Sequence, residues 1–225
     1  MTRAWFVTGT DTGVGKTFAS VALLHALRER GLSAVGMKPV ASGCEPGADG
    51  WYNEDALALQ SASDPVPAYA DVNPFALPVP TAPQLAARDA GIVVALPPLL
   101  AAFDRLSASA DAVVVEGAGG WLAPMGDGLE QSAMARALDG EVLLVVGLRL
   151  GCLSHARLSA RAIAADGCRL AGWIGNRVDP AFDRVDDYLQ LLADALPAPC
   201  LGVLGHGVDM GVAAASLRLP GDRPA

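Results

Sequence analysis

Lysine is scarce in this chain, and the scarcity makes the few lysines informative. Of its 16 basic residues only two are lysine, Lys16 and Lys38, and the rest are arginine. An ammonium group is a compact cation with three rotatable donors, whereas a guanidinium group is a planar fork. We therefore expect lysine at positions that need a compact cation. Each lysine lies near glycine and close to the end of an apolar run, where a phosphate site is expected.

The chain also lacks basic clusters and long apolar runs. Its net charge is −8 and its pI is about 4.7, which argues against a nucleic-acid-binding face. The longest apolar runs, such as residues 142–148, are far shorter than the roughly 20 residues that span a bilayer. The apolar segment after Met1 is too short for a signal peptide, so we expect a cytoplasmic protein with no membrane contact.

Paired cysteines and clustered histidines are missing as well. No C-x-x-C pair occurs and no histidine stands at ligand spacing, which argues against a structural zinc site. Scattered thiols suit a reducing compartment. The cysteines are Cys44, Cys152, Cys168 and Cys200.

Short apolar runs alternate with amphipathic stretches along the chain. This alternation predicts an α/β fold with a mostly parallel sheet flanked by helices. With 225 residues, about half of them apolar, we expect one domain over 1–225 with a poorly ordered tail from about residue 210. The expected strands are 4–8, 34–39, 112–116, 142–147, 170–176 and 200–204, and the expected helices are 16–30, 94–107, 155–166 and 182–196.

Residues 64–83 are rich in proline. Such a segment cannot join the centre of a sheet or form a long helix. We expect either an ordered excursion over the strand ends or a flexible loop.

A glycine-rich loop over residues 9–17 is the strongest motif. It reads Gly-Thr-Asp-Thr-Gly-Val-Gly-Lys-Thr and lies between an expected strand and an expected helix. Such a loop surrounds a phosphate with backbone N–H groups, brings Lys16 to the β- and γ-phosphates and offers the Thr17 hydroxyl to Mg²⁺. The pattern G-x-x-x-x-G-K-[ST] wants glycine at Thr10, and Gly9 is one residue too early. The sequence therefore predicts a P-loop NTPase fold with a variant Walker A loop.

Two acidic residues, one at the end of an expected strand and one just before an expected helix, are candidate Mg²⁺ ligands, because Mg²⁺ prefers hard oxygen ligands. Glu116 ends an apolar run, so its carboxylate should emerge at the carboxyl edge of the sheet. Asp55 precedes an expected helix and is either a second ligand or an ordinary helix N-terminal charge. Lys38 lies near the end of the second expected strand, and two cations at one triphosphate favour stabilisation of a transferring γ-phosphoryl group.

Five segments, in order, resemble the dethiobiotin synthetase family, and the similarity runs from residue 4 to about 205. A further Ala-Gly-Trp at 171–173, leading to Asn176, adds to it. The segments are 9–17, 38–43 (Lys-Pro-Val-Ala-Ser-Gly), 72–74 (Val-Asn-Pro), 115–121 (Val-Glu-Gly-Ala-Gly-Gly-Trp) and 150–152 (Leu-Gly-Cys).

This resemblance implies an ATP- and Mg²⁺-dependent cyclo-ligase of biotin biosynthesis. In that family 7,8-diaminononanoate takes up CO₂ as a carbamate, which attacks the γ-phosphate of ATP. The second amine then closes the cyclic urea and releases phosphate, with ADP as the other product. Family members are homodimers in which the neighbouring subunit helps to hold the substrate carboxylate.

The resemblance also implies roles for individual residues. Lys16, Lys38 and Thr12 correspond to catalytic residues, and Thr17, Asp55 and Glu116 to Mg²⁺ ligands. The substrate contacts would be Thr12, Ser42 and, across the dimer, Gly151, Cys152, Leu153, Ser154 and Tyr188. Asn176 would read adenine, and the nucleotide contacts would be Gly13, Val14, Gly15, Lys16, Thr17, Asp55, Glu116, Gly117, Ala118, Gly119, Asn176, Arg177, Gly205, His206 and Gly207.

Two other classes share the expected fold. Switch ATPases of the partition and division-site type carry a lysine five residues before the P-loop lysine, where this chain has Asp11. Synthetases related to cobyrinic acid a,c-diamide synthetase need a glutaminase domain, for which we expect no room here. Both remain alternatives to the cyclo-ligase.

Overall fold

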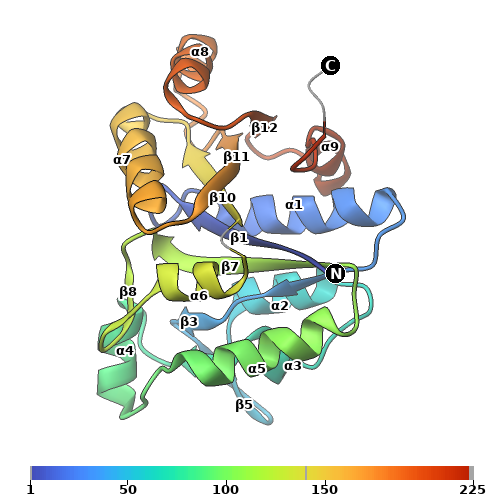
Figure 1. Cartoon of the computed structure of the whole chain (residues 1–225), viewed down its shortest axis with the longest axis vertical. Coiled ribbons are helices and arrows are strands. Elements are labelled where there is room, and N and C mark those ends of the chain that lie inside the picture. The colour runs from blue at the N-terminus through green and yellow to red at the C-terminus, as the bar shows by residue number, and fades with distance from the viewer. Residues whose placement is uncertain (1, 140, 223–225) are drawn as a thin grey trace.

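The core of the molecule is a six-stranded sheet whose neighbouring strands all run parallel. The computed structural model describes residues 2–139 and 141–222, and the sheet order is β12-β11-β10-β1-β7-β2 (Figure 1). All six predicted strands are confirmed, as is the α/β prediction. The strands are β1 (Arg3–Gly9), β2 (Ala34–Met37), β7 (Ala112–Gly120), β10 (Glu141–Gly147), β11 (Arg169–Asn176) and β12 (Cys200–Leu204).

Both faces of this sheet are buried, which explains the nearly continuous apolar runs. Val113 and Val115 of β7 pack into the core on one face, and Val114 packs into the core on the other. Side chains alternate along a strand, so a strand covered on both faces needs apolar residues at successive positions. The strand ends are therefore where polar residues can appear.

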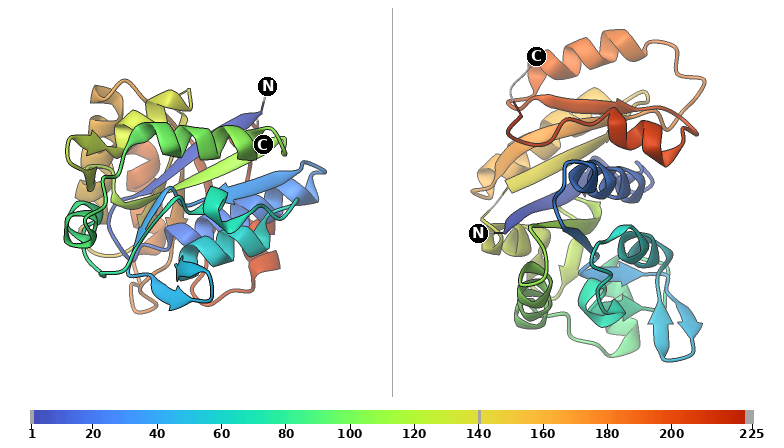
Figure 2. Two further views of the ribbon diagram at one scale, coloured as in Figure 1. Left: turned by 90° about the horizontal axis from the view of Figure 1, so that it is seen from below. Right: turned by 90° about the vertical axis from the view of Figure 1, so that its right-hand side faces the viewer.

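Helices cover the two faces in separate sets (Figure 2, left, where α5 and α1 lie on opposite sides of the sheet). One set is α1 (Lys16–Glu29), α2 (Glu54–Ala62) and α9 (Met210–Ala215), and the other is α5 (Leu96–Ser107), α6 (Gln131–Ala137), α7 (Cys152–Ala165) and α8 (Val185–Ala195). The helix predicted from residue 94 begins at Leu96 instead, with Pro97 and Pro98 in its first turn. Proline is tolerated there because first-turn N–H groups have no partner within the helix.

The proline-rich segment is an ordered excursion, the first of the two alternatives. It contains α3 (Tyr69–Val72) and β6 (Phe75–Leu77), and α4 (Pro83–Ala90) begins at its end. Strand β6 pairs with β3 (Val40–Ser42) outside the main sheet. Two further hairpins complete the described elements, β4 (Glu45–Gly47) with β5 (Gly50–Tyr52) and β8 (Pro124–Gly126) with β9 (Leu129–Glu130).

The C-terminal segment differs from the expectation of a poorly ordered tail from about residue 210. Helix α9 packs against α1, and Ala213, Ala214, Leu217 and Leu219 are buried. Small and apolar side chains at these positions cover the end of the α1 face of the core. Residues 223–225 of that expected tail lie outside the described residues. Among the described helices, none has the length and apolar character needed to cross a membrane.

Candidate active site

A cleft of about 790 Å³ opens where β1, β2 and β7 end. The carboxyl ends of parallel strands share one edge of the sheet, so the loops that follow them meet there. This geometry brings together most of the residues predicted for phosphate and metal, but only two of those predicted for substrate, Thr12 and Ser42. Those that line the cleft are Thr12, Gly13, Gly15, Lys16, Thr17, Lys38, Ser42, Asp55, Glu116, Ala118 and Gly119.

The glycine-rich loop takes a left-handed backbone at two positions. Gly13 has φ 72° and Gly15 has φ 81°, a region that glycine adopts without steric cost. Gly15 is also the N-cap of α1 and offers no side chain to the helix amides. The first-turn N–H groups of α1 are therefore open to an anionic ligand. Lys16 Nζ donates to the carbonyl oxygen of Asp11 at 3.1 Å and turns back over the loop.

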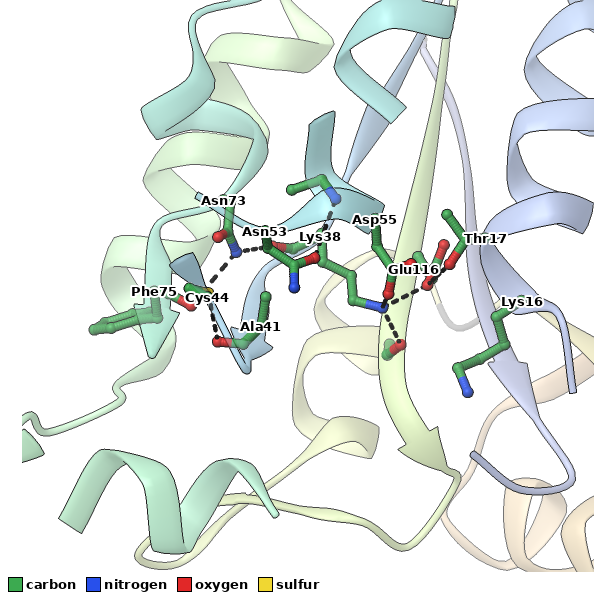
Figure 3. A network of polar contacts seen from close by, with 12 residues as sticks. Lys16, Thr17, Lys38, Ala41, Cys44, Asn53, Asp55, Asn73, Phe75 and Glu116 are labelled. Carbon is green, nitrogen blue, oxygen red and sulfur yellow. Dashed lines mark hydrogen bonds and ion pairs between the residues drawn. The ribbon is translucent and has the colours of Figure 1, made fainter. Parts of the chain in front are cut away.

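Lys38 bridges two carboxylates beside this loop (Figure 3). Its Nζ donates to Glu116 Oε1 at 2.5 Å, to Asp55 Oδ2 at 3.1 Å and to the carbonyl oxygen of Gly117 at 3.4 Å. The Thr17 hydroxyl donates to the same Glu116 oxygen at 3.0 Å. A single compact ammonium thus meets three acceptors, two from β7 and one from α2.

Burial and neighbouring charges give the two lysines opposite pKa shifts. Burial of the Lys16 ammonium, and then repulsion from Lys38, lowers the pKa of Lys16 to about 8. Burial alone would also lower the pKa of Lys38, but the carboxylates of Glu116 and Asp55 outweigh it and the pKa is raised. Burial alone would raise the pKa of Asp55, but Lys38 and Thr17 bring it below its ordinary value. Lys38 is therefore a fixed cation, whereas the lowered pKa of Lys16, about 8, lets part of its population lose the proton in mildly alkaline solution.

The oxygen atoms around Glu116 suit Mg²⁺. Glu116 is fully buried, and its Oε2 has no hydrogen-bond partner among the described residues. The Thr17 hydroxyl and the Asp55 carboxylate are the other two predicted ligands, and all three residues supply hard oxygen. The described part of the chain holds no group of three His, Cys, Asp or Glu residues able to bind a metal by themselves. Two carboxylates and one hydroxyl would leave positions for water or phosphate oxygens, which Mg²⁺ commonly uses.

Several predicted residues do not line the cleft. Val14 is buried, and its carbonyl oxygen accepts from Asn176 Nδ2 at 2.9 Å, so Asn176 braces the phosphate loop. Gly117 lies behind the cleft in β7 and presents its carbonyl oxygen to Lys38. The remaining ones lie at the ends of β11 and β12 or on α7 and α8: Arg177, Gly205, His206, Gly207, Gly151, Cys152, Leu153, Ser154 and Tyr188.

The cleft also contains residues that the sequence analysis missed. Asn53 lines it and caps α2, and an asparagine just before a helix is a recognisable capping signal. The segment 80–83 closes another side, and its place follows from an ordered proline-rich excursion over the strand ends. Ala41, Gly120 and Ala123 also line the cleft, and their side chains carry no chemical signal.

We predict that ATP binding takes up protons above pH 8. Lys16 is largely neutral there in the ligand-free protein, and an adjacent phosphate favours the charged ammonium and raises its pKa. At pH 8.5 the uptake should lie between about 0.5 and 1 proton per ATP, and it should vanish below pH 7, where Lys16 is already charged. Titration calorimetry in two buffers of different ionisation enthalpy measures this quantity. Lys16→Arg is the control and should show no uptake, whereas zero uptake by the native protein at pH 8.5 would contradict the assignment.

Solved structures with a similar fold are P-loop proteins. One is the MinC:MinD cell division protein complex of Aquifex aeolicus, with TM-score 0.55 and 15% identity, covering 94% of this chain and 84% of that one. Another is a ParA family ATPase from Chlorobium tepidum TLS, with TM-score 0.54 and 16% identity, covering 96% and 90%. At this identity the similarity shows the fold alone, because one fold serves many functions.

Sequence comparison is more specific. Residues 3–208 match the profile of a family described as an AAA domain. The ATP-dependent dethiobiotin synthetase BioD of Xanthomonas oryzae pv. oryzae (strain PXO99A) is 57% identical over 219 residues, which is 96% of this chain and 98% of that protein. The protein of the same name from Xylella fastidiosa (strain 9a5c) is 58% identical over 222 residues, covering 97% and 98%. The chain therefore belongs to the ATP-dependent dethiobiotin synthetase family.

Proposed function

We propose that this protein joins 7,8-diaminononanoate and CO₂ into dethiobiotin at the expense of ATP. The observation that carries the proposal is the Lys38 ammonium, held between Asp55 and Glu116 in the same cleft as the phosphate loop. A nucleotide loop alone serves many reactions. A second buried cation beside it suits a reaction in which an anionic acceptor attacks the γ-phosphate, because that attack brings two anions together.

The proposed reaction has three steps. One amine of the substrate adds to CO₂ and loses a proton, which gives a carbamate. A carbamate oxygen attacks the γ-phosphorus, and the bond to the β-phosphate oxygen breaks to release ADP. The second amine then attacks the carbamoyl carbon, loses a proton and expels phosphate, which leaves the cyclic urea.

Four polar residues of the cleft, Lys16, Lys38, Thr12 and Ser42, have roles in these steps. Lys16 and the open amides of α1 hold the ATP phosphates, and Lys38 neutralises the carbamate and the oxygens of the phosphoryl group in transfer. Thr12 and Ser42 line the same cleft, and their hydroxyls would orient the diamine and its carbamate. Because Lys38 is buried, its charge acts in a region of reduced dielectric constant, where it has more effect than in water.

We propose that Thr17, Asp55 and Glu116 hold Mg²⁺. When bound, the ion would neutralise the β- and γ-phosphate oxygens. The unpartnered Oε2 atom of Glu116 supports this assignment. Without the ion, the carboxylates of Asp55 and Glu116 bind the Lys38 ammonium. These two carboxylates would therefore contact both Lys38 and the Mg²⁺ that accompanies ATP.

Adenine and the substrate carboxylate would bind outside the described cleft. For adenine we propose Asn176 and Arg177 with residues 205–207. For the carboxylate we propose the N-terminus of α7 in a second subunit of a cytoplasmic homodimer, at Gly151 to Ser154, with Tyr188. Gly151 makes no side-chain cap hydrogen bond to α7, and the helix dipole favours an anion at this N-terminus.

A switch ATPase fits the site less well. That class has a lysine at the position of Asp11. Here that position is Asp11, whose Oδ2 accepts a hydrogen bond from Arg149 at 2.7 Å, so the lysine that marks this class is replaced by an acidic residue.

The experiment that tests the function is phosphate release from ATP. We expect release only when both the diamine and bicarbonate are present, because the phosphoryl acceptor forms from the two together. Omission of either one is the control. Rapid ATP hydrolysis without the diamine, unchanged when it is added, would refute the proposed function and favour a switch ATPase.

A further inference from the structure

The hydroxyl of Tyr69 lies at a junction between two parts of the site. Tyr69 is the first residue of α3 in the proline-rich segment and does not line the cleft. Its oxygen accepts a hydrogen bond from the backbone N–H of Asn53 at 2.7 Å and donates one to Asn73 Oδ1 at 3.1 Å. Burial raises the pKa of Tyr69, so the hydroxyl keeps the proton that it donates.

One arm of the junction reaches the backbone of Lys38. Asn73 is buried, and its Nδ2 donates to the carbonyl oxygen of Lys38 at 2.7 Å and to that of Phe75 at 3.4 Å (Figure 3). Two carbonyl oxygens on this side fix the orientation of the amide, since only its NH₂ group can donate to them. The backbone N–H of Lys38 donates to the carbonyl oxygen of Val72 at 2.8 Å. The proline-rich segment thus holds Lys38 where it leaves β2.

The other arm reaches the first turn of α2. The Asn53 side chain caps this helix by accepting from the backbone N–H of Ala56 at 3.2 Å, and Asp55 lies in the same turn. The side chains of Lys38 and Asp55 then meet at 3.1 Å. Backbone, side chains and the Tyr69 hydroxyl therefore form a closed polar ring around the metal-binding side of the cleft.

We propose that Tyr69 and Asn73 are positioning residues, which set the distance between Lys38 and Asp55 without touching substrate. This inference rests on the proposed function for the roles of Lys38 and Asp55. Displacing a reacting group by about 1 Å can lower the rate a hundredfold. Loss of one hydrogen bond from this ring should lower the rate less, because the other bonds of the ring remain. The proposal also assigns a role to the proline-rich segment. Its short α3 turn places Tyr69 and Asn73 four residues apart, so that both side chains lie on the same face of the turn.

Tyr69→Phe tests the proposal, with Tyr52→Phe as the matched control. The Tyr52 ring packs against that of Tyr69 with centroids 4.6 Å apart, but its hydroxyl makes no hydrogen bond to the rest of the described chain. Both variants keep the two rings and lose one oxygen. Turnover, the KM for ATP, the melting temperature and the binding of Mn²⁺ in the presence of ADP, followed by electron paramagnetic resonance, are compared.

For Tyr69→Phe we expect kcat to fall roughly tenfold and the Kd for Mn²⁺ to rise at least about threefold, with the KM for ATP unchanged. Tyr52→Phe should match the native protein. A Tyr69→Phe variant equal to Tyr52→Phe in both turnover and Mn²⁺ binding would overturn the proposal.

Asn73→Ala is the second variant, and it decides the question if Tyr69→Phe does not fold. Asn73→Ala alone should also lower kcat and weaken Mn²⁺ binding, with the KM for ATP unchanged, and a native-like Asn73→Ala would contradict the proposal. Where both single variants fold, the double variant should lose less activity than the product of the two single losses, because the hydroxyl acts partly through Asn73. Fully independent losses would contradict the shared junction. If the native protein shows no diamine-dependent phosphate release, the proposed function fails, whereas the Mn²⁺ titration still decides whether Tyr69 positions the metal ligands.

Discussion

Lys38→Arg is expected to lower kcat by at least roughly tenfold while the Kd for ATP stays close to its native value. Lys38 is 5% exposed, and its ammonium meets two carboxylates and one carbonyl oxygen within 3.4 Å. A planar guanidinium is larger and directs its donors differently, so it cannot put its charge at the same point. The positive charge survives the substitution, but its position changes. Steady-state turnover and equilibrium binding of ATP, measured side by side, give the two quantities.

Lys16→Arg is the matched comparison for this prediction. Lys16 belongs to the phosphate loop, so its replacement should weaken ATP binding as well as turnover. The two variants should therefore differ in binding even where both lose activity. Near-normal turnover of a folded Lys38→Arg variant would refute the special role of this ammonium.

Gly15→Ala is expected to lower both the stability of the protein and its affinity for ATP, the latter by at least roughly tenfold. A left-handed backbone costs a non-glycine residue about 1–2 kcal/mol. In addition, a Cβ at residue 15 would lie 2.0 Å from Asn176 Nδ2, whose amide is buried and bonded to the loop. Such overpacking costs about 1–3 kcal/mol more. Thermal unfolding without ligand and titration with ATP measure the two effects.

Gly13→Ala is the matched control in the same loop. Gly13 also has a positive φ, but a Cβ there would meet no atom within 4 Å. Gly13→Ala should therefore lose only the stability that the left-handed backbone costs a non-glycine residue. The melting temperature of Gly15→Ala should be at least about 2 °C lower than that of Gly13→Ala. Asn176→Ala in the Gly15→Ala background should recover part of the difference. Equal melting temperatures of the two glycine variants would show that Asn176 does not brace the loop.

The sequence predicted the sheet well because both of its faces are buried. Runs such as 113–115 and 142–146 must be apolar at every position, and their abrupt ends mark the edge where Lys38 and Glu116 emerge. The predicted strand ends therefore indicated directly which residues lie at the site. Helix starts were less accurate: α7 begins three residues before the expected position because Gly151, rather than a capping side chain, precedes it.

The parts that escaped prediction depend on contacts between distant residues. Tyr69 and Asn73 carry ordinary side chains in a proline-rich segment, and only the folded chain brings them to Lys38. Helix α9 has no long amphipathic pattern, and its two buried alanines are explained by packing near α1. The adenine and dimer residues follow from family resemblance and stay predictions.

Transfer of oxygen from bicarbonate to phosphate tests the central claim, carbamate phosphorylation, most directly. In this experiment, bicarbonate freshly labelled with oxygen-18 is supplied with the diamine and ATP in unlabelled water. Mass spectrometry then measures the oxygen-18 content of the released phosphate. The carbamate oxygen that attacks the γ-phosphorus stays with the phosphate when the ring closes, so each phosphate should carry one labelled oxygen. Phosphate without label, released at the rate of diamine-dependent turnover, would contradict the account, because ATP would then have been cleaved by water.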